Sequence, residues 1–466
     1  MTIAKQFYVT YRKDEKGVRR GGVLLQTDKE ESRKFLNEVI ADAKPESTPK
    51  TEVTRKAADT ETDRFDELII EVFEIFLALY ETIPNIRSFS SLMPKIILED
   101  QLKKIVKETA VDVESLDSGE LFTLPVTAYD KVTRLLKVHD SIQKTNQYID
   151  RFFILGLISL YDQFIRTLAQ HVIAIRPHCL LGQERTIKIS DVLNYKTIEE
   201  VKYACIDREL DRLLHESHLE QFKWFEEKLD LKIDPASDLK TRFTELCERR
   251  NLFAHTGGRV SQQYLDECRK VNYDLKDIKC GDELKSTRKY FATAVETVIE
   301  LATQLVHVIW QKTDKKGSTG AARSLINITF NLIRDGKYDL AIKLIEFILD
   351  NRTTQNKLDI ETKRIHLINH ANALKLAEKP DYLKRVDVED WSSMTLKEEL
   401  CLAAVRGEDE KFLKLLPKAI AAEEIFAQDF RTWPVFEPLR KSEKYVTLIQ
   451  EIFKEPIVEV VSKPTK

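Results

Sequence analysis

Apolar residues recur mainly at helical spacing along this chain. In most windows they occupy positions i, i+3, i+4 and i+7, the pattern of an amphipathic α-helix. The 466 residues include 13 Gly and 13 Pro, so few positions interrupt a helix. Because glycine and proline are the residues that most often end helices, the pattern predicts long helices and a mainly α fold.

The first residues are an exception to this pattern. Apolar and β-branched residues dominate Gln6–Arg12 and Gly21–Thr27, and the turn-rich stretch between them favours a β-hairpin. Thr27 and Glu30 then have the spacing of a capping box before a helix. Residues 1–42 are therefore predicted to form a small β-hairpin and helix segment.

Two polar segments divide the rest of the chain. Residues 43–63 are poor in apolar side chains and carry two prolines, a composition typical of linkers. Residues 313–321 (Thr-Asp-Lys-Lys-Gly-Ser-Thr-Gly-Ala) have a similar character. We therefore expect three parts joined by these two linkers.

Between the linkers, the pattern predicts a helical segment at residues 64–127 that leads into a helical bundle at residues 128–312. The expected helices cover residues 64–82, 92–109 and 126–175. The longest of them is expected to break near Asn146, and the last strongly apolar helix of the bundle to end near Trp310.

Beyond the second linker the pattern indicates successive helical hairpins. Their expected turns lie at Asp335-Gly336, Lys379-Pro380 and Gly407, and the second hairpin is expected to cover residues 359–386. A repeat at about 35-residue intervals is typical of a TPR-like α-solenoid, which we predict for residues 322–455. A plain helical bundle is the alternative, and residues 456–466 are expected to form a loose tail.

Charge and cysteine content narrow the function classes. The 74 basic residues nearly cancel the 77 acidic ones, so any contact with nucleic acid must be local. The six cysteines lack the spacing of a zinc site, which indicates reduced thiols and no metal. The N-terminus lacks a signal-peptide core, and the longest charge-free apolar stretch, Phe152–Tyr161, is about half a membrane span. We expect a cytoplasmic protein that does not enter a membrane.

The most informative segment is Lys240–Tyr264, KTRFTELCERRNLFAHTGGRVSQQY. Its helix is expected to stop at Gly257-Gly258, because glycine supplies a helix C-cap. At about 100° per residue, one apolar face contains Phe243, Leu246, Cys247, Phe253 and Ala254. Arg250 falls in the middle of that face, so a permanent charge is expected where a core or an interface should be.

A guanidinium in such a place needs a partner, because desolvating it alone costs several kcal/mol. Asp162 is the candidate, since helical spacing also sets its carboxylate inside an apolar stripe. Two misplaced opposite charges on neighbouring helices suggest a site. The alternative is a structural salt bridge, or a pair between Asp162 and Arg166 on one helix.

The residues around Arg250 suit phosphodiester chemistry. Asn251 and His255 lie four residues apart and so share a helical face with Glu248. A histidine exchanges protons near neutral pH, and a fixed guanidinium holds a phosphate and the charge it gains in a transition state. Arg249 and Arg259 are expected to add a local basic patch that binds RNA. Taken singly, a histidine such as His255 more often has a helix-capping or structural role, but its combination with Arg250 and Asn251 favours chemistry.

The stretch from Arg250 to His255, Arg-Asn-Leu-Phe-Ala-His, resembles the signature of the HEPN family, an Arg followed by four to six residues and a His. The resemblance covers roughly residues 128–312. It implies a bundle of helices in which Arg250 and His255 are the essential pair, Asn251 orients the phosphate or the histidine, and Asp162 positions Arg250. Some toxin branches carry a Tyr two residues after the His. Gly257 stands there in this chain, so chemistry that depends on that Tyr is in doubt.

Other chemistries have less support. His215 and His218 lie three residues apart, but no acidic or cysteine partner in the sequence completes a metal set, and a solvated face is the expected interpretation. The chain contains neither a P-loop nor a GxSxG elbow, so the sequence gives no support to an NTPase or a serine hydrolase.

The sequence therefore predicts a metal-independent HEPN endoribonuclease that needs no cofactor. It would cut RNA, tRNA being one candidate, by 2'-hydroxyl attack to a 2',3'-cyclic phosphate. The resemblance also implies a homodimer and a role as a defence or toxin effector against phage, with an antitoxin or trigger protein bound through the C-terminal helices. The alternative is a non-catalytic dimeric scaffold or sensor that recruits a protein partner.

Overall fold

The computed structural model describes residues 10–13, 19–22, 61–109, 112–116, 119–123, 125–180, 192–233, 235–313, 317–351, 358–442, 445 and 451. The chain divides into two compact units, residues 1–59 and residues 60–466. This boundary lies within the linker predicted at residues 43–63.

The described part of the first unit is a pair of short strands. β1 (Thr10–Lys13) pairs antiparallel with β2 (Arg19–Gly22). The strands expected at Gln6–Arg12 and Gly21–Thr27 overlap them only in part, and their other residues lie outside the described residues, as does the helix expected to follow. The hairpin with its helix stays a prediction.

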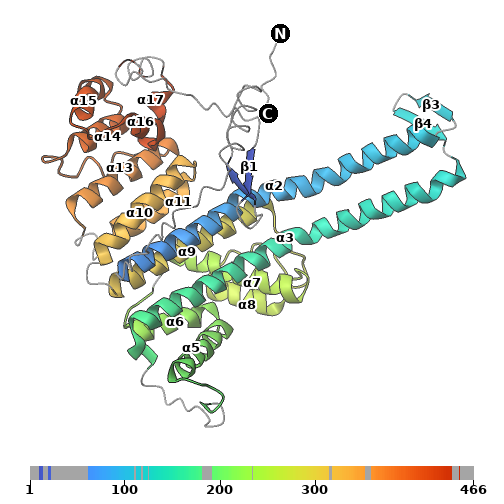
Figure 1. Ribbon diagram of the computed structural model, residues 1–466, viewed down its shortest axis with the longest axis horizontal. Helices are drawn as coiled ribbons and strands as arrows, with labels where there is room; N and C mark the ends of the chain where they lie inside the picture. Colours follow the sequence, from blue (N-terminus) through green and yellow to red (C-terminus); the bar gives the residue numbers. More distant parts are fainter. Residues whose placement is uncertain are drawn as a thin grey trace, which may run out of the picture. The chain divides into compact units, whose positions relative to one another are not determined.

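The second unit is mainly helical, as the periodicity predicts (Figure 1). Its described helices are α2 (Glu61–Thr109), α3 (Val126–Ile175), α5 (Ile198–His215), α6 (His218–Leu229), α7 (Ser237–His255), α8 (Gln262–Lys270), α9 (Arg288–Thr313), α10 (Gly317–Arg334), α11 (Tyr338–Asp350), α13 (Ile360–Leu376), α14 (Leu396–Arg406), α15 (Asp409–Ala421), α16 (Ala427–Thr432) and α17 (Glu437–Arg440), with short 3-10 helices η1 (Pro177–Leu180) and η2 (Pro434–Phe436).

The two longest helices, α2 and α3, are continuous, so the predicted break of α3 near Asn146 is wrong. Polar side chains in this stretch bond to their own helix: the hydroxyl of Ser141 donates to the Lys137 carbonyl oxygen at 2.8 Å, and that of Thr145 donates to the Ser141 carbonyl oxygen at 3.0 Å. Such bonds let polar residues remain in a helix, which periodicity alone does not reveal. Helix α2 likewise runs through residues 83–91, where the pattern predicts a gap between two helices.

A β-hairpin that the sequence pattern missed joins α2 to α3 (Figure 1). β3 (Asp112–Leu116) and β4 (Gly119–Thr123) pair antiparallel, with Val113 opposite Phe122. The strands have five residues each, too short for a clear alternation. Residues 64–127 are therefore not purely helical.

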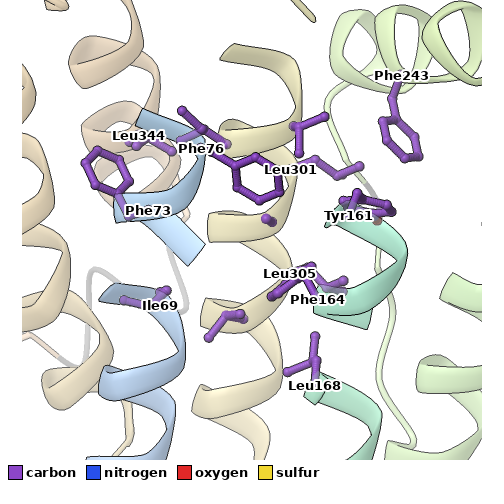
Figure 2. Close-up of a cluster of buried hydrophobic side chains, with 14 of the residues drawn as sticks. Ile69, Phe73, Phe76, Tyr161, Phe164, Leu168, Phe243, Leu301, Leu305 and Leu344 are labelled. Carbon is purple, nitrogen blue, oxygen red and sulfur yellow. The ribbon is translucent and has the colours of Figure 1, made fainter. Parts of the chain in front are cut away.

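The buried hydrophobic side chains described in the second unit form three clusters. One cluster joins α2, α3, α7, α9, α10 and α11, and Figure 2 shows part of it, with Phe76, Leu305, Tyr161 and Phe243 among the labelled residues. Since the buried residues of α2 begin at Phe65, the bundle starts before residue 128, where it was predicted to begin. The predicted linker at residues 313–321 is also too long, because α10 begins at Gly317 and packs on α9.

Two of the three predicted C-terminal hairpins are confirmed. α10 and α11 turn at Gly336, and α14 and α15 turn at Gly407, both with positive φ. The second hairpin is wrong, because α13 is followed by turns through residues 377–389 rather than by another helix. The buried Arg364 side chain holds the following loop by donating to the carbonyl oxygens of Asp390 and Ser393 at 2.7 and 2.6 Å.

Two segments of the described residues, Tyr148–Ile175 and Arg288–Thr313, are long and apolar enough to cross a membrane by length and composition alone. Buried residues make up 44% and 72% of their most apolar windows. Helix α9, the second of them, packs against α2, α7 and α10, and core helices of folded bundles pass the same test.

Candidate active site

The site is built around the end of α7, which stops after His255 as the glycine pair predicts. Gly257 and Gly258 have φ of 62° and 86°, values that L side chains rarely adopt. The Gly258 amide donates to the Leu252 carbonyl oxygen at 3.0 Å, closing the last turn. A Cβ on Gly258 would also lie 3.0 Å from the Leu284 carbonyl oxygen, so the chain needs glycine there.

Arg249, rather than Arg250, is the arginine that α7 buries most completely. Arg249 is 7% exposed, and its Nε donates to Glu245 at 2.6 Å. The hydroxyls of Tyr264 and Tyr290 donate to the same carboxylate at 2.8 Å each. The guanidinium also lies 4.0 Å from the centre of the Tyr290 ring. Because these contacts enclose it, Arg249 offers no surface to RNA, and its predicted place in a basic patch is wrong.

Arg250 lies one residue further along α7 and is only half-buried. Its Nε is buried and has no hydrogen-bond partner. Within the described part of the chain, its guanidinium forms no hydrogen bond and no ion pair. Because Arg250 is only half-buried, its guanidinium can still bind an acceptor from outside the chain.

Asn251 and Glu248 lie beside Arg250, on the face that the spacing predicts. The amide of Asn251 donates to the Glu248 carboxylate at 3.3 Å. Burial of Glu248 raises the pKa of its carboxyl above the usual value, although the hydrogen bond from Asn251 and the charge of Arg250 oppose that shift. The hydrogen bond to Glu248 therefore orients the Asn251 side chain, and Asn251 is adjacent in sequence to Arg250.

His255 is exposed at the last residue of α7. The following turn lies close to α3, because a Cβ added at Gly257 would lie 3.6 Å from the Arg151 guanidinium. Arg151 also bonds Glu283 at 2.7 Å, and Glu283 forms a β-bridge with the exposed Arg259. Arg259 thus lies on the surface near the His255 end of the helix.

The structure pairs Asp162 with His218, not with Arg250 as the resemblance implies. The two side chains lie 3.1 Å apart, from the carboxylate oxygen of Asp162 on α3 to Nε2 of His218 at the start of α6. The alternative pair with Arg166 is not formed either, because that guanidinium bonds Asp207 and Asp211 at 3.0 and 2.7 Å. Asp162 therefore has a partner that the sequence did not indicate.

His218 is not on a solvated face, so that expectation is wrong. Its ring packs between Tyr161 and Phe243, with ring centres 5.7 and 5.3 Å away. Burial opposes charge on the ring, but the Cys247 sulfur and the Asp162 carboxylate outweigh it and raise the pKa of His218 to about 10. His218 is charged at neutral pH and lies within electrostatic range of Glu248.

Helices α3, α6 and α7 thus bring a carboxylate, an imidazolium and an open guanidinium to one region. No signal in the sequence tied His218 to this region, because its partner lies 56 residues earlier. The N-cap at Ser217, whose hydroxyl accepts from the Glu220 amide at 3.3 Å, fixes His218 as the first residue of α6. Glu248 lies within electrostatic range of both His218 and Arg250. Asp162 and His218 can therefore influence the Arg250 guanidinium only indirectly, through Glu248.

Among the described residues, no group of three or more His, Cys, Asp or Glu side chains could hold a metal ion. No protein-family model matches this chain, and comparisons with curated proteins and with solved structures found no match.

Proposed function

We propose that this protein is a HEPN-type endoribonuclease that cuts RNA without a metal or a cofactor. The single observation that carries the proposal is the unpaired, buried Nε of Arg250 on the helix that ends at His255. The neighbouring Arg249 donates a hydrogen bond to the Glu245 carboxylate. Within the described residues, the Arg250 guanidinium on the same helix has no such partner.

The open guanidinium suits a phosphate oxygen, because a charged fork of donors binds phosphate with short, strong hydrogen bonds. In the proposed reaction the RNA 2'-hydroxyl attacks the adjacent phosphorus, and the bond to the 5'-oxygen breaks. The products are a 2',3'-cyclic phosphate and a 5'-hydroxyl. Arg250 stabilises the charge that the phosphate gains, as fixed donors do in a transition state.

His255 moves the protons of this reaction, taking one from the 2'-hydroxyl or giving one to the leaving 5'-oxygen. Its exposed place at the end of α7 supports this role, since the scissile bond must reach it. Asn251 steadies the site through Glu248, and Asp162 acts through His218 as a positioning residue. Exposed Arg259 binds the RNA backbone near the cut.

The proposal extends to partners. The resemblance of Arg250–His255 to the HEPN signature supports a cytoplasmic homodimer in which two motifs face one cleft, acting as a defence or toxin effector with RNA, tRNA included, as substrate. An antitoxin or trigger protein would bind the C-terminal helices, for which a TPR-like arrangement is proposed. The turns between α10 and α11 at Gly336 and between α14 and α15 at Gly407 support that proposal.

A second function is a non-catalytic dimeric scaffold or sensor. The favouring observation is the Asp162–His218 pair, because a partly buried ion pair beside aromatic rings is also found in purely structural helical bundles. The two functions differ at Arg250: a scaffold gains nothing from an unpaired buried donor, whereas a ribonuclease needs it free.

Cleavage in EDTA tests the proposal. Purified protein is incubated with labelled total RNA and tRNA beside Arg250→Ala and His255→Ala variants. Arg269→Ala and His215→Ala are matched controls, because both residues are exposed and lie away from the end of α7. The proposal predicts metal-free cleavage by the wild type and both controls, and at least a hundredfold loss in the two site variants.

Equal cleavage in all five samples would identify a contaminating nuclease and contradict the site. No cleavage by any sample, with dimers present in all of them, would favour the scaffold.

A further inference from the structure

A cavity of about 320 Å³ lies in the C-terminal part of the second unit, apart from the residues around Arg250. Its walls come from α10, α13, α14 and η2, and the lining includes Asn327, Phe330, Ile368, Asn369, Lys397 and Trp433. The volume is at the lower end of the range for small-molecule sites, which is about 300–1,000 Å³.

The wall contributed by η2 is fixed by its own packing. The Trp433 ring stacks on Phe436 with ring centres 5.8 Å apart, and Phe436 stacks on Phe430 at 5.5 Å. The Arg440 guanidinium donates to the carbonyl oxygens of Phe430 and Trp433 at 2.8 Å each. A wall held this way exists before a ligand arrives, so binding costs little reorganisation.

Most of the lining is apolar, but it includes three solvent-accessible polar side chains: Asn327 is exposed, and Asn369 and Lys397 are partly exposed. No hydrogen bond or ion pair within the described residues involves the side-chain amides of Asn327 and Asn369 or the ammonium group of Lys397. In contrast, the Glu398 carboxylate has partners within the protein: it accepts a hydrogen bond from the Thr395 amide at 2.8 Å and lies 3.7 Å from the Arg364 guanidinium. The charge left open at the cavity is therefore the positive charge of Lys397.

The start of α14 does not itself supply an anion site. The Lys397 amide donates to Glu424 at 2.8 Å, and the Glu398 amide donates to the Thr395 hydroxyl at 3.1 Å. With these backbone donors already used, contact with an anion depends on the Lys397 side chain and the two asparagines. The buried Cys401 thiol stays neutral, because burial raises its pKa to about 12.

From this chemistry we propose that the cavity binds a small amphipathic carboxylate, with an apolar body against Phe330, Ile368 and Trp433 and its carboxylate on Lys397. A chain or ring of about eight carbons with one acidic head matches the single open charge. A neutral ligand would leave the ammonium without a partner, and a polyanion would bring charges that the apolar walls do not solvate. The site would give the C-terminal helices a ligand of their own, whether or not the chain cuts RNA.

Calorimetric titration of the full-length protein with octanoate, below the concentration at which it forms micelles, tests this site. Octanamide is the neutral probe of equal length. We expect one octanoate per chain, octanamide binding at least tenfold more weakly, and a higher melting temperature with octanoate. The factor of ten follows from losing a hydrogen bond between charged groups.

Two variants and one control complete the test. Lys397→Met removes the charge but keeps the chain, and should weaken octanoate binding at least tenfold. Asn369→Phe fills the cavity from a partly exposed position and should abolish binding. Lys414→Met is the control, because this exposed lysine does not line the cavity, and its affinity should stay within twofold of the wild type.

The proposal is overturned if octanoate does not bind, if octanamide binds equally well, or if Lys397→Met binds octanoate like the wild type. Because the titration is independent of RNA cleavage, none of these results bears on the ribonuclease proposal.

Discussion

Replacing Arg249 by alanine should destabilise the second unit by about 3 kcal/mol, within the 3–5 kcal/mol typical of breaking a buried ion pair. The change removes the bond to Glu245 at 2.6 Å, the bond to the Lys285 carbonyl oxygen at 3.2 Å and the contact with the Tyr290 ring. It leaves a carboxylate that is 2% exposed without its countercharge. The estimate sits at the lower end because the hydroxyls of two tyrosines still donate to that carboxylate.

Arg250→Ala is the matched control, one residue away on the same helix. Within the described residues its guanidinium has no hydrogen-bond or ion-pair partner. Removing it should therefore lower the free energy of unfolding by less than about 1 kcal/mol. Urea unfolding followed by far-UV circular dichroism measures both variants, with equal m-values required for the comparison. The reasoning fails if Arg249→Ala unfolds within 1 kcal/mol of the wild type, or if Arg250→Ala loses as much stability as Arg249→Ala.

Three further predictions concern the framework of the site. The pKa of His218 is raised from 6.5 to about 10, so its stabilising charge is fully present below pH 6.5 and lost as the pH rises towards 10. The free energy of unfolding in urea should therefore fall less between pH 6.5 and pH 10 for His218→Asn than for the wild type. An identical fall in both proteins would contradict the pair with Asp162. Gly258→Ala should destabilise by about 2 kcal/mol, because its φ is positive and a Cβ meets the Leu284 carbonyl oxygen; a melting temperature equal to that of the wild type would refute this. Gly156→Ala should stabilise by about 0.5–1 kcal/mol, because a Cβ there meets nothing within 4 Å inside α3, and a loss of stability would argue against a continuous helix.

The sequence predicted those parts of the fold that depend on local signals. The end of α7 follows from Gly257-Gly258, and the turns at Gly336 and Gly407 follow from glycine where the chain needs positive φ. The mainly α class follows from the spacing of apolar residues. In each case a few neighbouring residues determine the structure, so no knowledge of distant contacts was needed.

The hairpin expected at residues 359–386 failed because the signal was not local. Pro380 was interpreted as a turn between two helices, but the buried Arg364 side chain instead fixes an irregular loop by bonding to the carbonyl oxygens of Asp390 and Ser393. A side chain that reaches 26 to 29 residues along the chain leaves no periodic trace.

The candidate site divides in the same way. The helix, its end and the positions of Arg250, Asn251 and His255 along it could be predicted, because they depend on one segment. Which of two adjacent arginines is enclosed could not be predicted: the spacing places Arg250 in the middle of the apolar face, but Arg249, about 100° away on the helix, is the buried one. The choice is made by Tyr264 and Tyr290, which come from later parts of the chain.

The chemical identity of the RNA ends tests the ribonuclease most directly. A labelled RNA is cut in EDTA, and mass spectrometry identifies the new termini, beside a substrate with 2'-deoxyribose at the cut site. The account predicts 2',3'-cyclic phosphate and 5'-hydroxyl ends, no cleavage at the deoxy position, and loss of both products in Arg250→Ala and His255→Ala. Ends carrying a 3'-hydroxyl and a 5'-phosphate, or cleavage that survives either substitution, would contradict it.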